Sequence, residues 1–362
     1  MDLEVLQENL SKALSITSRF VSSRAQLPVL ANILLKADKT KLTLSATNLE
    51  TSASISLGAK IKEDGELTIP AKNFFEVVSN LTQGTIHLTS EKESLRITGS
   101  GFTGRISGMN ASDFPKVPQI IKKDESIDLS KTKFLNALPQ VSFAASSDEG
   151  RPILTGILFI LSKKNLSLVA TDGFRLSKKT INLEKAGREI KIVIPKNILL
   201  EVSRVGEENE NIFLGVKEKE KQIVFGLDNL ILSSRVLEGE FPDFEKIIPK
   251  NSSIKVRVDK EEFLRAVKLS SVFARDSANI VKIKIMKDSI KLFAESSQVG
   301  NQETTLDAKV EGEGVEISFN YKFLEDFLRA VVGEEVVMEF NNASSPGVFT
   351  DPKDPNFLHL IM

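Results

Sequence analysis

Alternating apolar and polar positions recur three times along this chain at one fixed spacing. The first copy places apolar side chains at Leu42, Leu44 and Ala46. Equivalent triplets begin at Leu166 and Ile290, each 124 residues after the one before. Such alternation predicts half-buried strands, and a period this long predicts repeated domains rather than a solenoid of small units. A further strand is expected upstream of each copy, at residues 33–35, 157–159 and 281–283.

Six helices are expected, two in each repeat. The first follows the three-and-four spacing of a helix with one buried face, from Leu6 through Leu10 to Leu14. Prolines or an asparagine mark the starts of the second helices, with Pro70 and Pro195 expected in the first helical turn and Asn320 as a cap. The apolar anchors of the six helices are Leu10, Phe74, Phe134, Leu199, Phe263 and Leu324.

These elements predict an α+β fold of three repeated domains, each with two helices packed on antiparallel sheets. A chain of 362 residues also exceeds what one hydrophobic core usually supports. We place the domains at residues 1–122, 123–250 and 251–362, because proline-containing polar segments and a new helix follow one another at both junctions. The charged runs 217–221 and 351–355 are expected to be solvated turns between strands.

Composition and the N-terminal sequence indicate where in the cell the protein is located. The chain has no cysteine, which excludes disulfides and thiolate metal sites. Its first residues, Met1 to Glu4, lack the basic and apolar regions of a signal peptide. The longest apolar stretches are about half a membrane span or less. We therefore expect a cytoplasmic protein that does not contact a membrane.

No catalytic residue, metal ion or cofactor is expected. The two histidines, His87 and His359, lie in strand-like sequence without neighbours suited to catalysis, so we expect both to be structural or surface residues. Gly99 to Gly104 matches the GxGxxG pattern. A dinucleotide site would need a helix to begin there, but a strand-like segment and Asp113 follow instead. We expect an ordinary turn at these glycines.

Three motifs, taken together, resemble one known family. They are Arg24-Ala25-Gln26-Leu27-Pro28-Val29-Leu30, Ala170-Thr171-Asp172-Gly173-Phe174-Arg175-Leu176 and Phe241-Pro242-Asp243-Phe244. In this order, and over essentially the whole chain, they look like the bacterial sliding clamps, the beta subunits of DNA polymerase III. The resemblance implies the DNA-clamp fold, in which two chains of three domains close head to tail as a ring-shaped homodimer.

The same resemblance implies a non-catalytic processivity factor that encircles double-stranded DNA without reading its sequence. Lysine and arginine outnumber aspartate and glutamate in the expected helices, although the whole chain has a net charge of −1. That excess is consistent with loose, salt-sensitive phosphate contacts. Arg24 matches a DNA-contacting position of the family, and Lys72, Lys196 and Arg204 are the helical candidates. For each lysine, an ordinary solvated position is the alternative.

The resemblance also implies a groove between the second and third domains for short peptides of the replicative DNA polymerase, the clamp loader and repair proteins. A mostly apolar groove suits leucine and phenylalanine anchors. Its deeper part would use Thr171, Gly173, Phe174, Arg175, Leu176, Pro242, Ile247, Leu360 and Met362. The adjoining part would use Leu154, Asn320, Phe323, Ala343, Ser345 and Pro346. Read without the resemblance, residues 171–174 are equally a strand end with an Asp-Gly turn.

The sequence departs from the family pattern at three places in this groove. Phe174 stands where many members have histidine, and Phe323 stands where tyrosine is common. Family members usually continue for a few residues beyond the position of Met362, so we expect part of the groove's edge to be absent and peptide affinity to be affected. At the dimer interface, Ile106, Val272 and Phe273 are apolar candidates, with ordinary core packing as the alternative.

Two other classes of function stay open at this point. A magnesium-dependent nuclease could use carboxylates such as Asp172 and Asp243, although both lie in turn-like sequence and such sites need several carboxylates close together. A repeat scaffold that binds only proteins is the second. Magnesium-dependent nuclease activity that is lost in Asp172→Asn would favour the first class. Retention on circular DNA with release from linear DNA would separate a ring from the scaffold.

Overall fold

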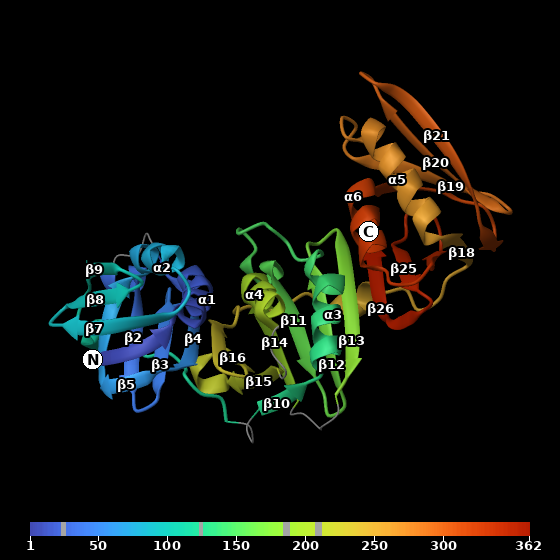
Figure 1. The fold of residues 1–362 in the computed structure, drawn as a ribbon. Helices are drawn as coiled ribbons and strands as arrows, with labels where there is room; N and C mark the ends of the chain where they lie inside the picture. The colour runs from blue at the N-terminus through green and yellow to red at the C-terminus, as the bar shows by residue number, and fades with distance from the viewer. Residues whose placement is uncertain (23–26, 123–125, 184–188, 207–211) are drawn as a thin grey trace. The chain divides into compact units, whose positions relative to one another are not determined.

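A computed structural model describes residues 1–362 except 23–26, 123–125, 184–188 and 207–211. The chain forms two compact units, of residues 1–131 with 197–236 and of residues 132–196 with 237–362. The described residues contain six α-helices, at the positions that the apolar spacing predicts (Figure 1). Their bounds are α1 Gln7–Thr17, α2 Ala71–Asn80, α3 Lys131–Ser142, α4 Lys196–Gly206, α5 Lys260–Ala274 and α6 Tyr321–Ala330.

Two antiparallel sheets build the first unit. One has the strand order β5-β1-β7-β8-β9, with β5 Lys60–Glu63, β1 Asp2–Leu6, β7 Thr85–Glu91, β8 Ser94–Gly99 and β9 Phe102–Ser107. The other has the order β10-β15-β16-β17-β4-β3-β2-β6, with β10 Ser126–Leu129, β15 Ile212–Lys217, β16 Gln222–Leu227, β17 Leu230–Arg235, β4 Thr51–Gly58, β3 Lys41–Thr47, β2 Asn32–Asp38 and β6 Gly65–Pro70. α1 packs against α2 and against β3 and β4.

The second unit also contains two antiparallel sheets. The larger has the order β14-β11-β12-β13-β26-β25-β24-β18-β22, with β14 Ile190–Pro195, β11 Gly156–Leu161, β12 Asn165–Thr171, β13 Arg175–Asn182, β26 Asp354–Ile361, β25 Gly347–Asp351, β24 Glu335–Phe340, β18 Ile254–Asp259 and β22 Lys309–Glu311. The smaller has the order β21-β20-β19-β23, with β21 Gly300–Asp307, β20 Ser289–Ser296, β19 Ile280–Ile285 and β23 Glu316–Asn320. α5 packs against α6 and against this smaller sheet.

Each large sheet joins strands of two sequence repeats. In the first unit β17 pairs with β4, and the hydroxyl oxygens of the opposed Ser52 and Ser233 lie 2.7 Å apart. In the second unit β13 pairs with β26, and Ser177 Oγ lies 2.7 Å from His359 Nδ1. Strand pairing at these junctions leaves no open edge between the joined repeats.

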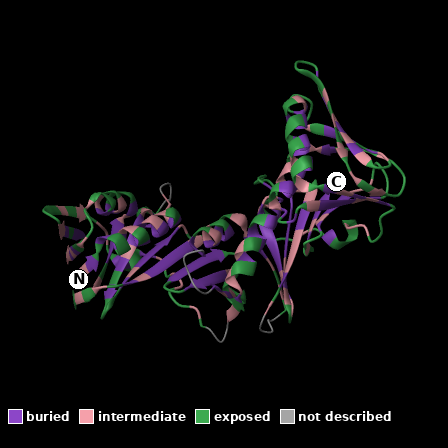
Figure 2. Ribbon diagram, turned by 45° about the vertical axis from the view of Figure 1, so that its right-hand side comes forward, coloured by how far each residue is buried: buried purple, intermediate pink, exposed green. Residues whose placement is uncertain are grey.

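The cores confirm the predicted periodicity. All six helix anchors are at most 1% exposed, and the three alternating triplets lie in β3, β12 and β20 with exposures of at most 2%. In the third repeat, Phe263 and Leu324 meet the strand residues Ile283 and Leu292 in one cluster. Figure 2 shows buried residues gathered in many of the strands, whereas the helices also carry exposed residues.

Several local expectations were wrong. Leu6 ends strand β1 and is 45% exposed, so it does not belong to the buried face of α1. Pro70 and Pro195 end strands immediately before α2 and α4 rather than standing in the first helical turn, whereas Asn320 caps α6 by accepting a hydrogen bond from Lys322 N. Asp351 is not solvated, since it is 1% exposed and accepts hydrogen bonds from the backbone of Gly333 and Lys353.

Candidate peptide-binding surface and open sheet edges

The chain's last strand ends beside the turn that precedes β13. The backbone N–H of Met362 donates to the carbonyl of Phe174 at 2.9 Å. Next to this bond, Arg175 pairs with Ile361 and Leu176 with Leu360 across β13 and β26. Strand pairing therefore brings together residues that lie far apart in the sequence at one end of the large sheet.

Hydrogen bonds fix the turn between β12 and β13. Oδ1 of Asp172 accepts from the backbone N–H groups of Phe174 at 2.9 Å and Arg175 at 3.1 Å. Oγ1 of Thr171 accepts from Gly173 N at 3.1 Å and donates to the carbonyl of Arg175 at 2.6 Å. Gly173 has a φ of 95°, which residues with a Cβ rarely adopt. The turn leaves the Phe174 side chain 63% exposed.

A compact apolar cluster supports this turn from below. Leu176 and Leu360 are fully buried and pack with Phe244 and Val348. Phe244 begins the short 3-10 helix η7 Phe244–Ile247, which leaves Ile247 36% exposed. Together with exposed Phe174 and Met362, this side chain offers apolar surface on a rigid base.

Arg175 is already engaged by protein groups. Its guanidinium donates to Asp172 Oδ2 at 3.0 Å, to Asp326 Oδ2 at 2.6 Å and to the carbonyl of Phe143 at 2.7 Å. It also lies 4.5 Å from the centre of the Phe323 ring, and the side chain is only 12% exposed. The guanidinium thus connects β13, α6 and the end of α3 before any ligand is present.

The remaining predicted groove residues differ in exposure. Leu154 is buried in the 3-10 helix η5 Pro152–Thr155, and Pro242 and Ala343 are exposed. Asn320 is the partly exposed cap of α6. Ser345 Oγ accepts from the backbone of Asn342 in the loop before β25. Pro346 lines a pocket of about 290 Å³ whose other residues include Pro249, Lys250, Asn251 and Val348.

Sequence reasoning missed Arg151 as a neighbour of the turn. Its Nη1 lies 3.1 Å from where a Cβ at Gly173 would stand. Arg151 is exposed and ion-paired with Asp148 at 3.0 Å. The sequence around Arg151 has no pattern of apolar and polar positions that would link it to Gly173. Only the folded structure shows that the two residues are neighbours.

The candidate DNA-binding cations occupy different environments. Lys72 is exposed on α2, whereas Lys196 is half-buried at the start of α4. Burial and the nearby charge of Arg175 lower the pKa of Lys196, and Asp326 opposes that shift. Arg204 is exposed and pairs with Glu201 at 2.7 Å. Arg24 lies outside the described residues.

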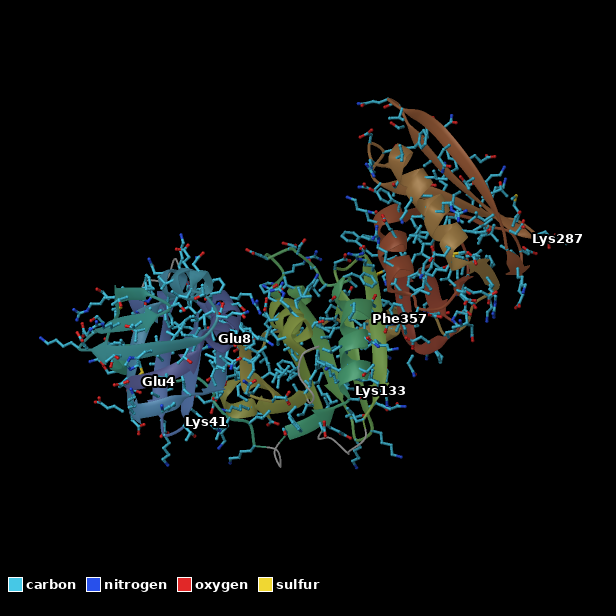
Figure 3. All side chains as sticks on the ribbon, in the orientation of Figure 1. Glu4, Glu8, Lys41, Lys133, Lys287 and Phe357 are labelled. Atoms are coloured by element: carbon cyan, nitrogen blue, oxygen red, sulfur yellow. The ribbon has the colours of Figure 1, made fainter. Side chains whose placement is uncertain are left out.

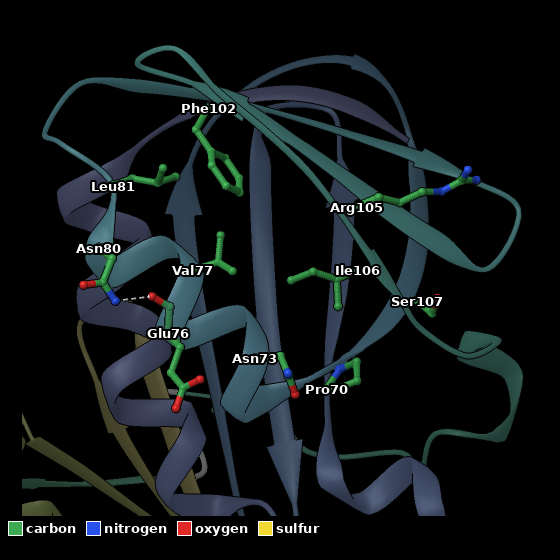
Figure 4. Close-up of a pocket in the computed structure, with 10 residues that line it drawn as sticks. All are labelled: Pro70, Asn73, Glu76, Val77, Asn80, Leu81, Phe102, Arg105, Ile106 and Ser107. Carbon is green, nitrogen blue, oxygen red and sulfur yellow. Dashed lines mark hydrogen bonds between the residues drawn. The ribbon is translucent and has the colours of Figure 1, made fainter.

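In the first unit, strand β9 ends its sheet. A pocket of about 670 Å³ lies between this strand and α2 (Figure 4). Phe102, which is 36% exposed, and half-buried Ile106 line it from β9, and Val77 lines it from α2. This edge combines free backbone groups of a terminal strand with apolar side chains, a combination that favours pairing with another strand.

In the second unit, β21 ends the smaller sheet, and α5 packs against that strand. On α5, Val272 is 49% and Leu269 is 51% exposed, while Phe273 is partly buried against the core of the third repeat. Packing against the core therefore explains why Phe273 is apolar, at least for the buried part of its side chain. It does not explain an apolar residue at the exposed position of Val272.

The structure assigns local partners to the residues considered for catalysis. His87 Nε2 lies 2.6 Å from Asp2 Oδ1, which corrects the expectation that it has no suitable partner, and that contact lowers the pKa of Asp2. Asp172 serves the turn described above, and Asp243 pairs with Lys246 at 2.8 Å. Gly99 and Phe102 pair in the β8–β9 hairpin, so the GxGxxG match is a turn.

The described part of the chain shows neither a metal-binding cluster nor a membrane-spanning helix. There, no group of three or more histidine, aspartate or glutamate side chains is arranged to hold a metal ion. No helix in those same ranges is both long and apolar enough to cross a membrane.

Three family models together match nearly the whole chain, in order. The N-terminal domain of the DNA polymerase III beta subunit matches residues 1–118, the central domain matches 128–243 and the C-terminal domain matches 245–362. The chain belongs to the DNA polymerase III beta subunit family. As a member it is a sliding clamp, a non-catalytic processivity subunit of a DNA polymerase.

Individual relatives agree with this assignment. The beta sliding clamp of Staphylococcus aureus is 28% identical over 376 residues, which cover 100% of this chain and 98% of the relative. The sliding clamp structure from Bacillus subtilis has a TM-score of 0.95 and 27% identity, with 100% and 98% of the two chains covered. The beta chain structure from Streptococcus pneumoniae has a TM-score of 0.93, also at 27% identity and with the same coverage.

Proposed function

We propose that two copies of this chain close into a ring around duplex DNA and hold the replicative DNA polymerase on its template. Three domains per chain, at residues 1–122, 123–250 and 251–362, would give the ring six similar segments. The six helices would face the DNA, and the paired sheets would form the outer wall.

The observation that carries the ring proposal is that two of the strands that end a sheet, β9 and β21, lie beside exposed apolar side chains. Each ends its sheet, and each lies beside exposed apolar side chains, Phe102 near β9 and Val272 near β21. An unpaired apolar edge is a liability in a monomer. Pairing β9 of one copy with β21 of the other would remove both edges, and the contact would close because each copy supplies one of each kind.

Contacts with DNA would be weak and independent of sequence. Lys72, Lys196 and Arg204, together with Arg24, would interact with phosphates, which carry no base identity. Such contacts allow the ring to slide. Enclosure rather than affinity would keep the clamp on DNA, in the cytoplasm where replication takes place.

Partner proteins would bind at the end of β13 and β26. The exposed apolar residues Phe174, Ile247 and Met362 lie around a buried cluster, an arrangement that suits apolar anchors of an extended peptide. Polar groups of Ser345 and the cap residue Asn320 are available at the border for the peptide backbone. Peptides of the polymerase, the clamp loader and repair proteins would compete for this one surface.

Topology provides the decisive experiment. Purified protein is loaded by its cognate clamp loader onto nicked circular DNA, and the DNA is then cut once with a restriction enzyme. We expect the protein to stay on the circle and to leave the linear product, because only an enclosing ring depends on DNA ends. Retention that does not change after cutting would refute the ring and favour direct DNA binding.

A matched variant makes the experiment specific. Ile106→Asp places a charge on the β9 edge, whereas Ile120→Asp changes an isoleucine that is 77% exposed and lies outside that strand. Only Ile106→Asp should abolish retention on the circle. Equal retention of both variants would contradict the proposed closure at β9.

A further inference from the structure

A polar cavity of about 660 Å³ lies between α3, the end of α6 and the strands β13 and β26. One face of α3 contributes Lys133, Asn136, Pro139 and Gln140, at the spacing of successive helical turns. Arg329 contributes from the last turn of α6. All of the residues that line the cavity belong to the second compact unit.

The acidic group of the cavity is already neutralised. Asp354, the one carboxylate among the lining residues, accepts hydrogen bonds from Lys179 Nζ and, at 2.9 Å, from Gln140 Nε2. The Lys179 side chain is only 12% exposed, so this pair belongs to the wall of the cavity. A ligand would therefore meet no free carboxylate among the residues that line the cavity.

Two cations of the cavity can reach a ligand. Lys133 is exposed on α3 (Figure 3). Arg329 is 62% exposed and directs Nε and Nη2 to one oxygen of Glu325, at 3.2 Å and 2.6 Å. Its guanidinium carries five N–H groups, so several donors are left for a second acceptor. Both side chains favour an anion.

Neutral donors complete the lining. The amides of Asn136, Asn182 and Asn356 are exposed at the cavity, and amide N–H groups are common donors to phosphate oxygens. Ile181 and Val332 add apolar surface at the border, and Val332 is 77% exposed. Cations, amides and a small apolar border together fit a phosphate that is attached to a sugar better than a free anion.

We propose that this cavity is a seat for one backbone phosphate of duplex DNA. The inference rests on the proposed function, because the ring would place α3 and α6 around the DNA. It deepens that function by adding one defined phosphate contact to those proposed for the other helix cations. A contact with a phosphate carries no base identity, so it would leave the clamp free to slide.

Binding of a short, fluorescent, blunt-ended duplex tests the seat by anisotropy over a range of salt concentrations. For the double variant Lys133→Gln/Arg329→Gln we expect weaker binding and a salt slope reduced by about one, as for the loss of one phosphate contact. For Asn136→Leu, which leaves the charge unchanged, we expect a dissociation constant raised about three- to tenfold. Inorganic phosphate, used as a competitor, should not displace the duplex when the total ionic strength is held constant.

Controls separate the seat from general electrostatics. Lys163→Gln removes an exposed charge from the β11–β12 turn, outside the cavity, and should keep the wild-type slope. Wild-type affinity in Asn136→Leu, or equal slopes in the double variant and Lys163→Gln, would overturn the inference. Displacement by inorganic phosphate would overturn it as well, in favour of a site for small anions.

The circular-DNA experiment, run on the same variants, keeps the two proposals apart. If every variant stays on circular DNA and binds the duplex as tightly as the wild type, the phosphate seat is refuted and the proposed clamp function is not affected. Failure of the wild-type protein itself to depend on DNA topology would instead remove the ring, and the seat with it.

Discussion

Nη1 of Arg175 donates a hydrogen bond of 2.6 Å to Oδ2 of Asp326, which joins the start of β13 to α6. The same guanidinium holds Asp172 in the preceding turn and the carbonyl of Phe143 after α3. One largely buried cation therefore connects three segments around exposed Phe174. The arginine of the predicted groove builds the platform on which a peptide would lie.

Replacing Arg175 with alanine should cost both stability and peptide binding. The change leaves Asp172 and Asp326 without their cation and Phe143 O without its donor. We expect the free energy of unfolding to fall by about 2–3 kcal/mol, as for charge-assisted hydrogen bonds that are largely buried. Urea unfolding followed by circular dichroism measures the loss.

Arg257→Ala is the matched control for this loss. Arg257 pairs with Glu335 at 3.0 Å, but its side chain is 40% exposed. A solvated pair contributes little, so we expect a change within about 0.5 kcal/mol. Equal destabilisation by the two variants would contradict the role given to the Arg175 network.

Phe174→Ala and Met362→Ala should weaken peptide binding without destabilising the fold. The two side chains are 63% and 47% exposed, so truncation removes little buried area. Loss of an apolar anchor at an interface costs about 1–2 kcal/mol, which corresponds to a dissociation constant raised roughly five- to thirtyfold. Titration with a synthetic peptide that carries leucine and phenylalanine anchors measures the effect.

Val332→Ala serves as the control for the peptide titration. Val332 is 77% exposed in the same compact unit but follows the opposite end of α6 from Asn320. Its affinity for the peptide should equal that of the wild type. If Phe174→Ala and Met362→Ala also bind normally, the peptide site lies elsewhere on the chain.

The sequence alone predicted the elements that depend on local periodicity. Leu42, Leu166 and Ile290 identified equivalent strands, because a strand with one buried face must alternate. Phe74 and Leu199 identified helices in the same way, and both are buried as expected. Repetition of these local patterns over the chain was enough to give the fold class.

Interactions between distant segments were beyond such reasoning. Arg175 and Asp326 are separated by 151 residues, and His87 and Asp2 by 85. No spacing rule links such pairs, since tertiary packing alone brings them together. Asp351 shows the same limit. Its turn-like sequence gave no sign that the side chain would be buried or that its carboxylate would accept a hydrogen bond from the backbone N–H of Gly333.

Charges placed on the open edges should prevent dimer formation. Phe102→Asp on β9 and Val272→Asp on α5 each introduce a carboxylate where we propose that apolar surface becomes buried. Desolvation of an unpaired charge costs several kcal/mol, so we expect monomers at micromolar concentration. Sedimentation velocity distinguishes a monomer from a ring of two chains.

Ile120→Asp is again the control, since it adds the same charge outside both edges. Normal circular dichroism of the two edge variants would show that their sheets still fold. A dimer that survives Phe102→Asp and Val272→Asp would exclude β9 and α5 from the interface. A dimer lost in Ile120→Asp would point to net charge rather than a specific edge.

Acid should destabilise the second unit through His359. This histidine is fully buried and stacks on Phe327 with 5.5 Å between ring centroids. Burial first, and then the charge of Arg175, lower the pKa of His359 to about 3. An unfolded histidine titrates near about 6.5, so below that pH the unfolded chain binds a proton that the folded chain refuses. Stability is therefore complete above about pH 6.5 and falls as the pH drops toward the folded pKa.

The size of this loss can be isolated in a His87→Gln background, where His359 is the one remaining histidine. Between about pH 8 and about pH 5.5 the free energy of unfolding should fall by about 1.4 kcal/mol from this residue. Replacing His359 with glutamine removes the titrating group and should remove that dependence, although loss of ring stacking lowers stability at every pH. Urea unfolding at both pH values tests the difference. A fall of the same size in the protein without histidine would show that other groups cause the acid sensitivity.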